Sequence, residues 1–128
     1  MSPMLLPVTF TFASILAIML IPLTGWIGLR RDKIGGVFRG AGDDPTLFKR
    51  IRIHGNLMEN APVFILVLAS SEAAGLGTAW LWIAGVTFLT GRVLHFRLFD
   101  SRKRGLAMLI TLLPGAFMGI WLLLKIWL

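Results

Sequence analysis

The chain has 128 residues and a net charge of +7, and 56% of its residues are hydrophobic whereas 15% are charged. So few polar side chains cannot cover the surface of a water-soluble domain, which indicates that the lipid bilayer is the solvent. The sequence contains no cysteine and two histidines, which excludes disulfides and a thiol nucleophile, and we expect no metal site. No groove-reading motif accompanies the basic residues, so we expect membrane lipids and no nucleic acid as partners.

Four hydrophobic segments follow one another along the chain, and each predicts a helix. The first, third and fourth are long enough to cross a hydrocarbon layer of ~30 Å with ~20 residues. The second apolar run is shorter, so its helix has to begin earlier, with Asp44 as N-cap and Pro45 as first helical residue. We therefore expect a single domain with an all-α fold, an integral membrane four-helix bundle. Its helices are expected at about 4–30, 45–71, 77–98 and 105–127.

The charges between the helices predict the orientation in the membrane. Residues 30–52 contain seven Lys and Arg and residues 92–104 contain five, whereas the connection "SSEAAGLGTAW" contains none. Basic loops remain on the cytoplasmic side of a membrane. We therefore expect both basic segments in the cytoplasm and both termini on the non-cytosolic side.

A polar stripe is predicted on the second helix. Arg52, Asn56 and Glu59 are spaced i, i+4 and i+7, which places them on one helical face. Glu59 then lies well inside the span, where a carboxylate needs a cationic partner or a polar cavity, and Arg52 and Arg92 are the candidate partners. Such a stripe can also serve only to fix helix packing. The combination of Arg, Asn and Glu favours a ligand site.

Two motifs resemble one known family. "RIHGNLMENAPVF" is similar to the second-helix signature of the MAPEG proteins, the membrane-associated proteins in eicosanoid and glutathione metabolism. "GRVLHF" resembles the third-helix signature of bacterial members, a resemblance that implies a location in a bacterial inner membrane. The resemblance covers essentially the whole chain. The matching positions are Arg52, Asn56, Glu59, Pro62, Arg92 and His95.

The resemblance implies a homotrimer that binds glutathione as cosubstrate between neighbouring subunits, at the cytosolic side. Arg52, Asn56 and Glu59 would hold the tripeptide, with Glu59 at its ammonium group. Such a site would serve a glutathione S-transferase or peroxidase that acts on lipophilic electrophiles or lipid hydroperoxides. The other binding positions implied are Arg30, Arg31, Arg92 and His95.

Catalysis by glutathione needs the thiolate, and a nearby arginine lowers the pKa of a thiol. The resemblance implies that an arginine at the start of the fourth helix has this role. Arg104 is the first candidate and Arg102 the second. The family commonly has tyrosine after the motif glutamate, where this chain has Asn60, and the sequence contains no tyrosine. A mechanism that uses a tyrosine hydroxyl is therefore excluded.

Two other functions remain open. One is a non-catalytic MAPEG-like subunit that packs against other membrane proteins or lipids. The other is a small proton-coupled exporter, because small multidrug transporters also combine four helices with one membrane glutamate. Those exporters carry the glutamate on the first helix, whereas this chain has no acidic residue before Asp32.

Overall fold

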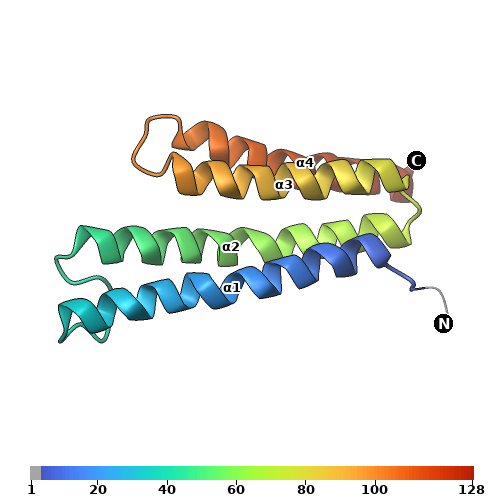
Figure 1. The fold of residues 1–128 in the computed structure, drawn as a ribbon. Coiled ribbons are helices and arrows are strands. Elements are labelled where there is room, and N and C mark those ends of the chain that lie inside the picture. The colour runs from blue at the N-terminus through green and yellow to red at the C-terminus, as the bar shows by residue number, and fades with distance from the viewer. Residues whose placement is uncertain (1–3) are drawn as a thin grey trace.

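The computed structural model describes residues 4–128, and within them it contains four α-helices and no strand. Figure 1 shows the helices running side by side along one axis, with successive helices antiparallel. The α1–α2 and α3–α4 loops lie at one end of the bundle, and the α2–α3 turn and the C-terminus lie at the other. The expected all-α four-helix fold is confirmed. The helices are α1 (Pro7–Ile34), α2 (Pro45–Ala73), α3 (Thr78–Arg97) and α4 (Arg104–Trp127).

The first helix extends further than the sequence predicted, since it ends at Ile34 rather than near residue 30. Gly35 ends it, because its φ of 66° is a left-handed conformation that glycine adopts without strain. Arg31 and Lys33 lie in the last turn, where cations interact favourably with the negative end of the helix dipole. The first basic residues of the expected loop therefore belong to α1.

The second helix begins as predicted. The Asp44 side chain caps it by accepting a hydrogen bond from the Leu47 N–H at 2.6 Å, and Pro45 occupies the first helical position. The helix continues through the charged stretch and through Pro62 without interruption. A single helix therefore carries the whole polar stripe from the basic end of the bundle into its apolar middle.

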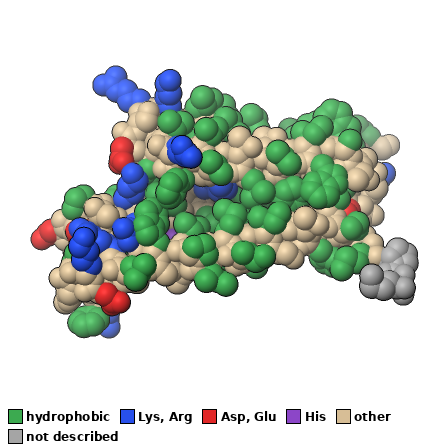
Figure 2. Space-filling view, in the orientation of Figure 1, with side chains coloured by type: hydrophobic (Ala, Val, Ile, Leu, Met, Phe, Trp, Pro, Cys, Tyr) green, Lys and Arg blue, Asp and Glu red, His purple; other side chains and the backbone are tan. Residues whose placement is uncertain are grey.

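The surface of the molecule suits a bilayer. By length and composition, α1, α3 and α4 could each cross a membrane. Figure 2 shows hydrophobic side chains over the middle of the bundle and Lys and Arg gathered at the end that carries the two long loops. Large apolar side chains such as Ile21, Leu66 and Leu123 are more than half exposed. Lipid, rather than water, is the solvent that such a surface requires.

Close helix packing fixes the positions of the polar residues on α3 and α4. Gly91 of α3 lies against the backbone of Thr111 in α4, so that a Cβ on Gly91 would be 2.7 Å from the Thr111 nitrogen. Only glycine permits this approach. Nearer the apolar middle, the rings of Phe64 and Phe88 stack with centroids 4.1 Å apart and join α2 to α3.

Candidate functional site

Arg92 of α3 is the centre of a buried polar cluster. It is 6% exposed, and its Nε and Nη2 donate to the Thr111 hydroxyl at 3.2 and 2.7 Å. Nη1 donates to the Asn56 side-chain oxygen on α2, and Nη2 also contacts the Met108 sulfur at 3.3 Å. Within residues 4–128, no carboxylate pairs with this guanidinium. Arg92 thus links α2, α3 and α4 through neutral acceptors.

Glu59 pairs with Arg52, one of its two expected partners. Arg52 Nη1 donates to Glu59 Oε1 at 3.4 Å, and the two side chains are 45% and 58% exposed. Arg52 and Glu59 therefore share one face of α2, as the spacing predicted. An exposed pair of this length contributes at most about 1 kcal/mol. The carboxylate of Glu59 retains most of its capacity to bind a ligand.

A polar cavity of about 360 Å³ lies between α2, α3 and α4 at the basic end of the bundle. The Arg104 guanidinium lies 5.2 Å from the centre of the Phe99 ring, and the His95 ring meets Phe99 edge-on at 5.8 Å. The structure thus brings together four of the predicted site residues, namely Arg52, Asn56, His95 and Arg104. The cavity is lined by Phe48, Arg52, Asn56, His95, Phe99, Arg104 and Met108.

Five predicted residues do not line this cavity. Glu59 lines a neighbouring cavity between α2, α3 and α4, and Arg92 lines another between α1, α2 and α3. The other three are Arg30, Arg31 and Arg102. Arg30 donates two hydrogen bonds to Asp44, at 3.1 and 2.6 Å, and Arg31 donates to the Val37 carbonyl at 3.1 Å. Arg102 is exposed and does not line the cavity. The hydrogen bonds from Arg30 and from the Leu47 N–H lower the pKa of the Asp44 carboxyl below its ordinary value of 3.8.

Thr111 and Met108 are the members of the site that sequence reasoning missed. Thr111 fixes two nitrogens of Arg92 and itself donates to the Ala107 carbonyl at 2.9 Å. It is the one hydroxyl-bearing residue of α4, in an otherwise apolar stretch, and that signal was visible in the sequence. Residues 4–128 contain no group of three side chains suited to a metal ion.

The fold and the site define an all-helical integral membrane protein with a cavity at one end of its bundle that two arginines help to line. The MAPEG family model matches residues 9–124, and the chain belongs to the MAPEG family. The resemblance inferred from the two motifs is thereby confirmed.

Curated relatives agree with this assignment. The chain is 33% identical over 92 residues to the inner membrane protein YecN of Escherichia coli strain K12, a match that covers 64% of this chain and 70% of the relative. The inner membrane protein YecN of Escherichia coli O6:H1, strain CFT073, matches with the same identity and coverage. No solved structure matches the chain.

Proposed function

We propose that the protein is a glutathione-dependent transferase or peroxidase of the inner membrane that acts on lipophilic electrophiles or lipid hydroperoxides. One observation carries the proposal. Two arginines, a carboxamide and an imidazole line a single cavity of about 360 Å³, and a carboxylate lies 3.4 Å from one of those arginines. The similarity to an inner membrane protein supports the location.

The chemistry of this cavity matches the groups of glutathione. The tripeptide carries two carboxylates, one ammonium and one thiol. Arg52 would bind a carboxylate with its guanidinium fork, and Glu59 would bind the ammonium in place of its exposed contact with Arg52. Arg104, at the first position of α4, would stabilise the thiolate. Arg104 is a better candidate for this role than Arg102, because Arg104 lines the cavity.

The same proposal includes a homotrimer. On α2 the exposed face continues from Arg52 and Glu59 to Val63 and Leu66, which are 62% and 68% exposed. A charged pair within a membrane span is costly when it faces lipid, so this face needs a protein neighbour. A second copy would cover it and could bring its own Arg30 to the site. Native mass spectrometry in mild detergent should show three protomers, and a monomer would contradict this assembly.

Glutathione titration by calorimetry tests the proposed reaction at its first step. The parent protein should bind glutathione, and the bound thiolate should be visible by its ultraviolet absorbance. An arginine near a thiol lowers its pKa by about 1 unit or more, so Arg104→Gln should reduce the thiolate-to-thiol ratio by about tenfold. Arg102→Gln is the matched control, because it removes an exposed neighbouring arginine, and it should leave the ratio unchanged.

A non-catalytic membrane subunit is the second candidate, and a specific observation favours it. Four polar residues already form two pairs within the protomer, since Asn56 accepts from Arg92 and Arg52 pairs with Glu59. The polar stripe would then fix helix packing against a second membrane protein or lipids. If the parent protein does not bind glutathione in the titration, the result favours a non-catalytic subunit over a glutathione-dependent enzyme.

A further inference from the structure

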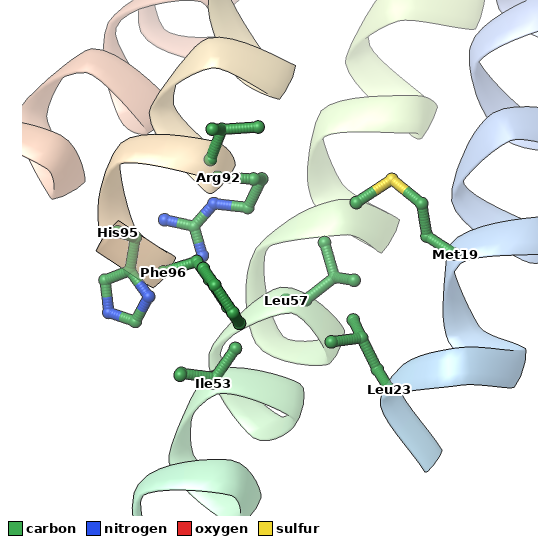
Figure 3. Close-up of a pocket in the computed structure, with 8 residues that line it drawn as sticks. Met19, Leu23, Ile53, Leu57, Arg92, His95 and Phe96 are labelled. Carbon is green, nitrogen blue, oxygen red and sulfur yellow. The ribbon is translucent and has the colours of Figure 1, made fainter. Parts of the chain in front are cut away.

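A second cavity lies within the protomer, between α1, α2 and α3, and the proposed glutathione site does not use it. Its volume is about 150 Å³, and its lining is mainly apolar. In Figure 3, side chains of α1 and α2 face each other across the cavity and α3 closes the remaining side. The residues concerned are Met19 and Leu23 of α1, Ile53 and Leu57 of α2, and Arg92 and His95 of α3.

His95 has unused hydrogen-bonding capacity at this cavity. The residue is 4% exposed, and neither ring nitrogen has a hydrogen-bond partner in the part of the chain that the structure describes. Arg92 adds a further donor, because a guanidinium has five N–H groups and hydrogen bonds to Thr111, Asn56 and Met108 use four of them. Both residues line the cavity, so they can donate hydrogen bonds to a ligand that has an oxygen acceptor.

The cavity can be reached from the bilayer. Val93 and Phe96, which line it, are 54% and 44% exposed on the outer surface of the protomer. A shallow groove along α1 shares Leu23 and Phe96 with the cavity and includes Pro22 and Trp26. A lipophilic molecule dissolved in the membrane would therefore meet an apolar surface that leads to His95.

We propose that this cavity binds a small lipophilic molecule, a ring-sized or short alkyl group that bears one hydroxyl, hydroperoxide or carbonyl oxygen. The size follows from the volume, since an apolar cavity of about 150 Å³ accepts benzene. The oxygen accepts a hydrogen bond from His95 or Arg92. Because His95 lines both cavities, this molecule lies next to the basic cavity, although its binding requires no glutathione.

Two fluorinated probes of equal ring size test the proposal in nanodiscs without glutathione. One is para-fluorocumyl alcohol, which has the hydroxyl, and the other is para-fluorocumene, which lacks it. Fluorine NMR measures the saturable binding of each probe above its partition into protein-free nanodiscs. A hydrogen bond is worth ~0.5–1.5 kcal/mol, so the alcohol should bind about 2- to 12-fold more tightly than the hydrocarbon.

Val93→Phe should fill the mouth of the cavity and weaken the binding of both probes by about tenfold or more. Val86→Phe is its matched control, because Val86 lies on the same face of α3 two turns away, is 55% exposed and does not line the cavity. Leu23→Phe blocks the cavity from α1 and replaces Val93→Phe if that variant does not fold. His95→Phe and Arg92→Leu should both retain the binding of the hydrocarbon, and one of the two should abolish the preference for the alcohol.

Loss of binding in Val93→Phe or Leu23→Phe, with normal binding in Val86→Phe, supports the site. Equal binding by Val93→Phe, Val86→Phe and the parent overturns it, as does binding no stronger than partition into protein-free nanodiscs. An alcohol preference that persists in His95→Phe and also in Arg92→Leu overturns the assignment of the polar groups. Because no glutathione is present, failure of the proposed enzyme leaves these outcomes unaffected.

Discussion

Glu59 and Glu72 lie on the same helix, yet their surroundings differ. Glu72 accepts hydrogen bonds from the Val8 and Thr9 backbone N–H groups at 2.9 and 2.7 Å, whereas Glu59 has a single contact, with Arg52, at 3.4 Å. One carboxylate is engaged by backbone donors, and the other is 58% exposed and weakly paired. A membrane glutamate is therefore not by itself evidence for a ligand site, because its hydrogen-bond partners decide its role.

The role of Glu72 follows from the start of α1. The N-cap residue Leu6 has no side chain that could accept a hydrogen bond, and Pro7 has no N–H. The next two N–H groups would lack partners at the apolar end of the bundle. Glu72 supplies two acceptors from α2 and a negative charge at the positive end of the α1 dipole. Both oxygens of the Glu72 carboxylate are thus occupied by the N-terminus of α1.

The largest expected contrast concerns the two ends of α2, which we expect on opposite sides of the membrane. The chain has no cysteine, so Phe38→Cys in the α1–α2 loop and Gly77→Cys in the α2–α3 turn each introduce a single thiol. An impermeant maleimide added to intact cells should label Gly77→Cys and not Phe38→Cys. Labelling of Phe38→Cys but not Gly77→Cys would show that the protein has the opposite orientation in the membrane.

The next largest effect is expected for Glu72→Ala. This substitution leaves two backbone donors without charge-assisted hydrogen bonds, which should lower the free energy of unfolding by about 3 kcal/mol. Denaturation in sodium dodecyl sulfate, followed by circular dichroism, measures the loss. Glu59→Ala is the matched control on the same helix, and it should cost about 1 kcal/mol or less because its ion pair is exposed. Equal losses in the two variants would remove the distinction between the two glutamates.

Glu59→Gln tests whether the exposed glutamate of α2 binds a ligand. If Glu59 receives the ammonium of glutathione, loss of a charge-assisted bond worth ~1.5–3 kcal/mol should weaken glutathione binding by about 10- to 150-fold. The stability of the ligand-free Glu59→Gln protein should remain unchanged. Glu72→Gln should instead lower the stability and leave glutathione binding unchanged. No binding by the parent, together with a loss of several kcal/mol in Glu59→Gln, would indicate a structural ion pair and favour the non-catalytic subunit.

The smallest expected effect is a pH dependence at the N-terminus of α2. The pKa of Asp44 is lowered in the folded protein, chiefly by its hydrogen bond from Arg30. A lowered pKa stabilises the fold above the unfolded-state value of about 4, and this contribution is lost as the pH falls through the folded-state pKa. The unfolding temperature of the parent should therefore decrease at acidic pH.

Asp44→Asn isolates that contribution. Its unfolding temperature should change less than that of the parent between about pH 6 and pH 3. Asp43→Asn is the control, because this adjacent carboxylate forms no hydrogen bond or ion pair within residues 4–128. If Asp43→Asn and Asp44→Asn reduce the pH dependence equally, the Arg30–Asp44 pair has no specific role.

The candidate site was predictable to the extent that it depends on one helix. The spacing of Arg52 and Glu59 places them on one face of α2. Their contact across two helical turns requires extended side chains that reach toward each other. The partner of Asn56 was not predictable in this way. The sequence offers Arg92 as a partner for Glu59, but Arg92 donates to Asn56 instead, because Thr111 holds its guanidinium inside the bundle.

The sequence by itself determined the features that arise within one helix or one turn of chain. These are the apolar lengths that predict the helices, the cap at Asp44 and Pro45, and the polar stripe of α2. Only the tertiary structure decided that Glu72 caps α1 across 64 residues and that Arg92 joins Asn56 to Thr111. Such contacts depend on how one helix is rotated and shifted against another. Packing between helices, such as Gly91 on Thr111, fixes that relation, and no single helix encodes it.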